Sequence, residues 1–178
     1  MKTSKFTSYK IDLKNLTAIS QIFDFELNSD FFKTIDSSEI ERGNVKARVV
    51  GQRKSQSFAL KISLEGCVMV SCNRCLDDMQ QPISYSETLM VKFGKNFDED
   101  GNTVIVPETD GYIDLAYFFY EMIVVNIPIK HVHPEGECNV AMQQKLEKYS
   151  VYSLVEQDNI SNNNSKVDPR WEKLKEIK

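Results

Sequence analysis

The chain has 178 residues, of which 41% are apolar and 27% charged, so one packed domain, with or without a tail, is expected. Its formal net charge of −4 argues against unaided binding to bulk nucleic acid. No apolar run reaches the roughly 18 residues of a membrane helix, and the first residues lack the apolar segment of a secretion signal. Composition therefore excludes a membrane protein, a secreted disulfide-rich fold and a strongly basic chromatin-like binder.

The first half of the chain predicts β-strands. Apolar and polar residues alternate, as in half-buried strands, in residues 19–27, 45–50, 58–64 and 82–93. Gly66 indicates a turn or bulge after the third of these segments. Thr103–Val106 predicts a short additional strand.

Two segments of the first half do not follow this alternation. Ser29–Ile35 predicts one helical turn, with Ser29 or Asp30 as its N-cap. The charged segment Asn96–Asn102 predicts a hairpin loop, because it has no apolar period and holds a glycine.

The pattern changes to helical spacing at Asp114. The apolar residues of Asp114–Asn126 recur at helical intervals, Asp114 is a suitable N-cap, and Pro128 prevents continuation. Val140–Tyr149 predicts a second, exposed helix. These elements predict an α+β fold: a curved antiparallel β-sheet or open barrel of roughly five to seven strands, packed by one apolar helix, with a peripheral helix and a C-terminal tail.

The expected domain organisation is a single α+β domain over residues 1–150, followed by a tail over residues 151–178. The tail begins with the polar linker Val155–Ser165, which has too few apolar residues to order itself. It continues as a basic amphipathic segment in which Trp171, Leu174 and Ile177 lie three residues apart. Such a segment predicts docking, either on its own domain or in a partner groove.

The sharpest chemical motif is the Cys-x-x-Cys formed by Cys72 and Cys75. Two thiolates at this spacing can bind one tetrahedral Zn²⁺, and a closed site needs two further ligands. His131, His133 and Cys138 offer candidates within eight residues of each other. The predicted metal ligands are therefore Cys72, Cys75, His133 and Cys138.

Three other interpretations of these cysteines stay open. The thiols can be reduced residues at strand ends that pack as small hydrophobic groups. A redox motif is a second interpretation, although such motifs open helices and this one lies between predicted strands. A Cys–His nucleophile is a third, although the sequence shows no third orienting group for it.

Basic side chains provide the candidate contacts to RNA or to a partner. Four lie in one predicted hairpin and two in the tail, where Trp171 is a further candidate contact; the alternative role of the basic residues is that of ordinary solvated cations. The candidate residues are Lys46, Arg48, Arg53, Lys54, Arg170, Trp171 and Lys173.

Four motifs in order resemble those of the YceD-like family, the large ribosomal RNA subunit accumulation proteins. Cys72–Leu76, followed by Pro82 and a strand ending in Val91-Lys-Phe, is similar to the centre of that family. The other three motifs are the Ile113–Pro128 helix, the Cys-containing loop His133–Cys138, and the terminal Asp-Pro-Arg-Trp sequence that begins at Asp168. The resemblance extends roughly from Val45 to the C-terminus.

The resemblance implies a cytoplasmic bacterial protein needed for accumulation or processing of large-subunit rRNA, with no known catalytic residues. Many relatives carry further cysteines after the helix, whereas this chain has only Cys138 there, with His131 and His133 nearby. His133 is therefore the expected substitute ligand if a structural zinc ion is bound.

The expected function is that of a non-enzymatic ribosome-biogenesis factor that binds rRNA or a ribosomal protein of the large-subunit precursor. The alternative is a small zinc- or thiol-dependent enzyme or sensor that uses the Cys-x-x-Cys and the His/Cys cluster. A third possibility is a general interaction module whose Trp171 tail binds another protein. The sequence predicts no membrane partner and does not define the oligomeric state.

Overall fold

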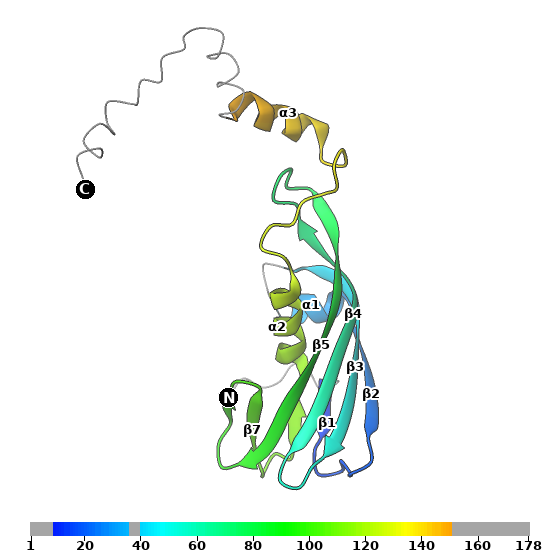
Figure 1. Ribbon diagram of the computed structural model, residues 1–178, viewed down its shortest axis with the longest axis vertical. Helices are drawn as coiled ribbons and strands as arrows, with labels where there is room; N and C mark the ends of the chain where they lie inside the picture. Colours follow the sequence, from blue (N-terminus) through cyan, green and yellow to red (C-terminus); the bar gives the residue numbers. More distant parts are fainter. Residues whose placement is uncertain (1–8, 36–39, 151–178) are drawn as a thin grey trace, which may run out of the picture. The chain divides into compact units, whose positions relative to one another are not determined.

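The computed structural model describes residues 9–35 and 40–150 (Figure 1). The internal contacts divide the chain into two compact units, Met1–His133 and Pro134–Lys178. The first unit holds the strands β1 (Lys10–Asp12), β2 (Gln21–Leu27), β3 (Arg42–Arg53), β4 (Phe58–Ser71), β5 (Asp78–Gly94), β6 (Asp98–Asp100), β7 (Thr103–Pro107) and β8 (Tyr112–Asp114), and the helices α1 (Ser29–Ile35) and α2 (Ala116–Asn126).

A six-stranded sheet in the order β2-β3-β4-β5-β7-β6 dominates the first unit. Its neighbouring strands are antiparallel except for β5 and β7, which are parallel. β1 and β8 form a separate antiparallel pair. The predicted α+β fold is confirmed, and the sheet is mixed and is not closed into a barrel.

Alternation of apolar residues gives the large sheet one buried inner face. In β4 the side chains of Leu60, Ile62 and Leu64 are fully buried, whereas Lys61 between them is exposed. The helix α2 covers this inner face (Figure 1), and its Phe119 ring lies 5.5 Å from the ring of Phe25 in β2. Burial of apolar area in this layer is the main source of stability of the unit.

The strand β4 continues through Gly66 without a break in register, so the predicted turn or bulge at this residue is wrong. Gly66 pairs with Val45 of β3 on one side and with Ile83 of β5 on the other. A Cβ atom at this position would lie 2.2 Å from the carbonyl oxygen of Asn44, and the glycine has a φ of +157°. The glycine is therefore required by the close approach of β3.

Three local predictions need correction. The N-cap of α1 is Asn28, whose Oδ1 accepts from the amides of Asp30 and Phe31, because an Asn before the helix satisfies two free amides at once. The predicted loop Asn96–Asn102 contains β6, since main-chain pairing with β7 does not need apolar side chains. The apolar helix begins at Ala116, and the carboxylate of Asp114 accepts from the Ala116 amide.

The second unit contains α3 (Val140–Tyr149), which has the predicted bounds. The side chain of Asn139 caps it by accepting from the amides of Ala141 and Met142. No α3 side chain is buried, as predicted for an exposed helix. No helix in the described ranges is long and apolar enough to cross a membrane.

Replacement of Gly66 by Ala should destabilise the protein by roughly 2–4 kcal/mol, because its Cβ would overlap main-chain atoms of β3. Gly101→Ala is the matched control. Gly101 also has a positive φ, of +55°, but its Cβ would meet nothing within 4 Å, so only a backbone cost of about 1 kcal/mol is expected. Urea unfolding measures both, and equal losses would contradict the steric explanation.

Candidate metal centre

The Cys-x-x-Cys lies in the turn that joins the two longest strands. β4 ends at Ser71 and β5 begins at Asp78, and these two residues pair with each other. The turn is closed by hydrogen bonds from the amide of Leu76 to the carbonyl of Cys72 and from the amide of Cys72 to the carbonyl of Asp77, both 2.9 Å. Both cysteine side chains of this tight turn are buried.

The segment after α2 is joined to this turn by two reciprocal hydrogen bonds. The amide of Asn73 donates to the carbonyl of His131 at 2.9 Å, and the amide of His131 donates to Oδ1 of Asn73 at 2.8 Å. Asn73 therefore holds residues 131–133 beside the cysteines. The ring of His131 itself is used elsewhere, because its Nδ1 lies 2.9 Å from the carbonyl oxygen of Pro128.

The imidazole of His133 faces the thiols. Its Nδ1 lies 3.3 Å from Sγ of Cys75, and its Nε2 lies 3.3 Å from the carbonyl oxygen of Asp78. A carbonyl oxygen can only accept, so this contact places a hydrogen on Nε2 and leaves Nδ1 facing the thiols. Nδ1 can donate to a thiolate when it carries a hydrogen, and it can bind a metal when it does not. A carbonyl behind a histidine ligand is a common arrangement in protein metal sites.

Four possible ligands gather at this turn. One ligand atom from each of Cys72, Cys75, His133 and Cys138 lies within 4.8 Å of every other. Bonds of about 2.0–2.3 Å to a tetrahedral zinc ion would place ligand atoms roughly 3.3–3.8 Å apart. The four groups therefore fit such an ion after a contraction of about 1 Å, and three sulfurs with one nitrogen form a donor set that zinc prefers.

The surroundings of Cys72 at this turn favour its thiolate form. Burial raises the pKa of Cys72, but hydrogen bonds from the amides of Cys75, Arg74 and His133 and from the His133 ring outweigh it, so the pKa falls to about 5. The hydrogen bond with Cys72 raises the pKa of His133 against the opposing effect of burial. A bound metal cation would also lower the pKa of the thiol, as these hydrogen-bond donors do.

The four predicted ligands are thus brought together, whereas His131 and Cys67 are not in the group. Sequence reasoning missed Asn73 and Asp78 as supporting residues. An amide side chain between the two cysteines was an available signal for Asn73. Asp78 contributes only its main-chain carbonyl oxygen. Every residue has this group, so the sequence gives no signal for its role.

The predicted basic contacts of the hairpin divide into two pairs. Arg48 forms an ion pair with Asp24 at 2.7 Å, and Lys46 stands between Glu26 of β2 and Glu65 of β4 in the strand register. Arg53 and Lys54 lie at the turn between β3 and β4, and the Arg53 guanidinium lies 5.8 Å above the ring of Phe58. The predicted tail contacts Arg170, Trp171 and Lys173 lie outside the described residues.

Comparison with known proteins gives one match. A family model described as "Large ribosomal RNA subunit accumulation protein YceD" matches residues 60–178. This range includes β4 from Leu60 onward, β5, α2, the four candidate ligands and the C-terminal tail. No curated protein and no solved structure matches the chain.

In metal-free, reduced protein, the ultraviolet absorbance of a thiolate should persist at neutral pH and disappear only as the pH falls through about 5. The lowered pKa of Cys72 has this sign because the folded protein stabilises the charged form. Cys72→Ser should remove the low-pH signal, and Cys67→Ser should retain it. A single titration near the ordinary thiol range would contradict the described hydrogen bonding.

Proposed function

Because the chain belongs to the YceD family of large ribosomal RNA subunit accumulation proteins, we propose that it is a non-enzymatic ribosome-biogenesis factor acting in the cytoplasm. The family match over residues 60–178 is the observation that carries this proposal. The factor supports accumulation or processing of large-subunit rRNA by binding rRNA or a ribosomal protein in the precursor particle.

The burial of the thiols favours a structural role over catalysis. Cys72 is 0% exposed and Cys75 is 1% exposed. A nucleophilic or redox cysteine needs a low pKa and also access for its substrate, and only the first condition holds here. The alternative of a zinc- or thiol-dependent enzyme or sensor rests on the same lowered pKa of Cys72, and thiol accessibility distinguishes the two.

The proposed cofactor is one structural zinc ion held by Cys72, Cys75, His133 and Cys138. When bound, zinc would supply a closed four-ligand link that needs no open coordination position. The chain's own residues prepare this link, since Asn73 holds the histidine segment and the Asp78 carbonyl orients the His133 ring. The link would fix the tip of the long β4–β5 hairpin to the segment that follows α2.

The proposed partner is the precursor of the large ribosomal subunit. The net charge of −4 requires that any contact to RNA be made by local cationic surfaces. Arg53 and Lys54 in the hairpin, with Arg170, Trp171 and Lys173 in the tail, are the proposed contacts. The sequence also predicted contacts by Lys46 and Arg48, but we do not include them in the proposal, because neighbouring carboxylates offset both charges.

Purified protein should hold one zinc ion per chain by elemental analysis, and removal by a strong chelator should lower its thermal midpoint by roughly 5 °C or more. Cys75→Ser should lose the zinc, whereas Cys67→Ser should keep it, because Cys67 lies outside the ligand group. Absence of stoichiometric metal from reduced protein prepared without chelators would rule out the proposed cofactor.

The protein should co-sediment with large-subunit precursors in a sucrose gradient of lysate at low salt, with and without crosslinking. Recovery only at the top of the gradient under both conditions would contradict the proposed function. Arg170→Ala/Trp171→Ala should weaken co-sedimentation while the thermal midpoint stays nearly constant. A large loss of stability would instead assign these two residues to the fold.

A further inference from the structure

The outer face of the large sheet carries two kinds of cationic side chain, which differ in their neighbours. In its middle, cations alternate with carboxylates: Arg48 pairs with Asp24, and Lys46 stands in register between Glu26 and Glu65. These charges compensate one another within the sheet. An anionic ligand therefore gains little from them.

Nearer the turn that joins β3 and β4, the outer face lacks these carboxylates. Lys61 stands in register between Val50 of β3 and Thr88 of β5, and Lys92 stands beside Ile105 of β7. The row between them consists of Gln52, Ala59, Met90 and Thr103, and it ends at Asp100 of the edge strand β6. Arg53 ends β3 opposite the inner-face residue Phe58, and Lys54 follows it in the turn. We call Lys61 and Lys92 of the outer face, together with Arg53 and Lys54 at this turn, the lysine end; all four side chains are exposed.

Ion pairing within the described part of the chain does not involve the lysine end. The two ion pairs there are Arg48–Asp24 and Arg42–Asp78. Lys54 donates to the neutral Oε1 of Gln52 at 2.7 Å. On β6, the carboxylates Asp98 and Asp100 end the rows of Lys92 and Met90. Both lie two strands away from β5, so each is separated from Lys92 by about 10 Å or more, a distance at which salt largely screens the charge.

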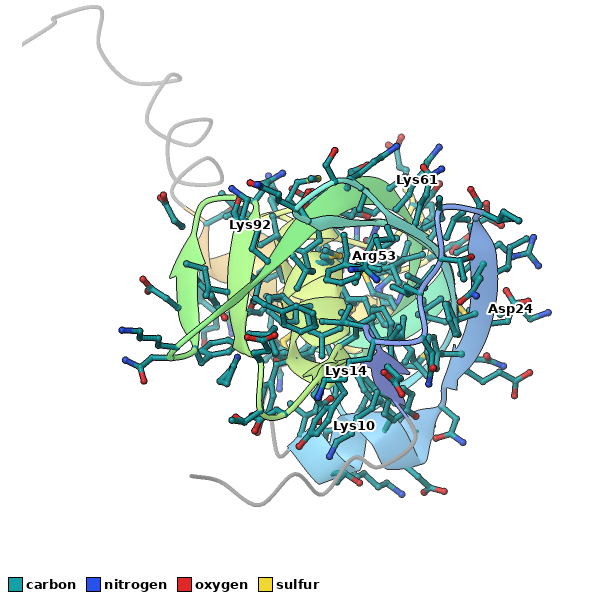
Figure 2. All side chains as sticks on the ribbon, turned by 90° about the horizontal axis from the view of Figure 1, so that it is seen from below. Lys10, Lys14, Asp24, Arg53, Lys61 and Lys92 are labelled. Atoms are coloured by element: carbon teal, nitrogen blue, oxygen red, sulfur yellow. The ribbon has the colours of Figure 1, made fainter. Side chains whose placement is uncertain are left out.

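Figure 2 views the protein from this side and labels three of the four residues, together with Lys10 and Lys14. The Lys10 ammonium lies 4.4 Å above the Tyr112 ring. The nearby carboxylate of Asp12 already accepts from the Lys14 amide and from the side-chain amide of Asn15. The cations at this end therefore belong to several strands and loops that the sheet holds in fixed positions.

From these positions we infer that the lysine end binds the phosphate backbone of RNA; this inference rests on the proposed function and names the partner of one of its surfaces. Lysines separated by neutral side chains suit a row of phosphates, since each ammonium acts as a point charge. Lys61 and Lys92 are about 14 Å apart along the sheet, which suits contacts to different nucleotides. Their neighbours on this face are aliphatic or small polar residues, so the binding is independent of base sequence.

The test compares two double variants that remove the same charge from the same face. Lys61→Gln/Lys92→Gln changes the lysine end, and Lys46→Gln/Arg48→Gln is the matched control in the compensated rows. Fluorescence anisotropy with a labelled transcript of large-subunit rRNA measures affinity across a range of salt concentrations. The first variant should lose about tenfold in affinity at low salt. The slope of log affinity against log salt concentration should become shallower by the amount expected for about two phosphate contacts. The control should stay within about twofold of the unchanged protein.

Equal losses for the two variants would overturn the inference, because affinity would then follow net charge and not position. Unchanged affinity of Lys61→Gln/Lys92→Gln would overturn it as well. If the unaltered protein does not bind the transcript but does co-sediment with precursor particles, the lysine end does not bind RNA, and the proposed function survives with a protein partner. If co-sedimentation is also absent, the proposed function fails too. Thermal midpoints of both variants should match the unchanged protein, since all four replaced side chains are exposed.

Discussion

The antiparallel pairing of β4 with β5 is the constraint on which the rest of the structure depends. It runs without interruption from Phe58 opposite Val91 to Ser71 opposite Asp78. Because side chains alternate strictly along a strand, this register fixes which residues enter the core and which face outward over the whole hairpin. One end of the hairpin carries the cysteines, and the other carries the lysine end. A slip of one residue would disrupt the core, the candidate metal centre and the cationic surface together.

Sequence periodicity predicted the helices and strands that bury one face. It failed where main-chain geometry determines the path of a strand or the direction of its pairing. α3 has the predicted bounds, and the α+β class is confirmed. The continuation of β4 through Gly66 depends on the close approach of Asn44 from another strand, which no local pattern contains. The parallel pairing of β5 with β7 likewise comes from tertiary packing, since strand direction leaves no mark on alternation.

The candidate site shows the same division between local and tertiary information. The spacing of Cys72 and Cys75 is a local signal, because the chain between them forms one tight turn. The sequence predicted His133 as the ligand, but the reason for its position is tertiary, since the two hydrogen bonds of Asn73 hold the histidine segment beside the cysteines. Lys61 and Lys92 are widely separated in sequence and lie on one face only because β4 pairs with β5. The pattern of charges along the sequence therefore does not predict that these two lysines share a surface.

The Asp24–Arg48 ion pair has a consequence for colloidal behaviour. β2 is the terminal strand of the large sheet, so one side of its backbone has no strand neighbour within the described residues. Such an edge can recruit a strand from another molecule and start aggregation. Asp24 and Glu26 place exposed carboxylates on this edge strand, and Arg48 neutralises only the first of them by a direct ion pair. In the rows of this part of the sheet, the carboxylates of Asp24, Glu26 and Glu65 outnumber the cations Lys46 and Arg48. The remaining negative charge disfavours RNA and also repels a second copy of the same edge.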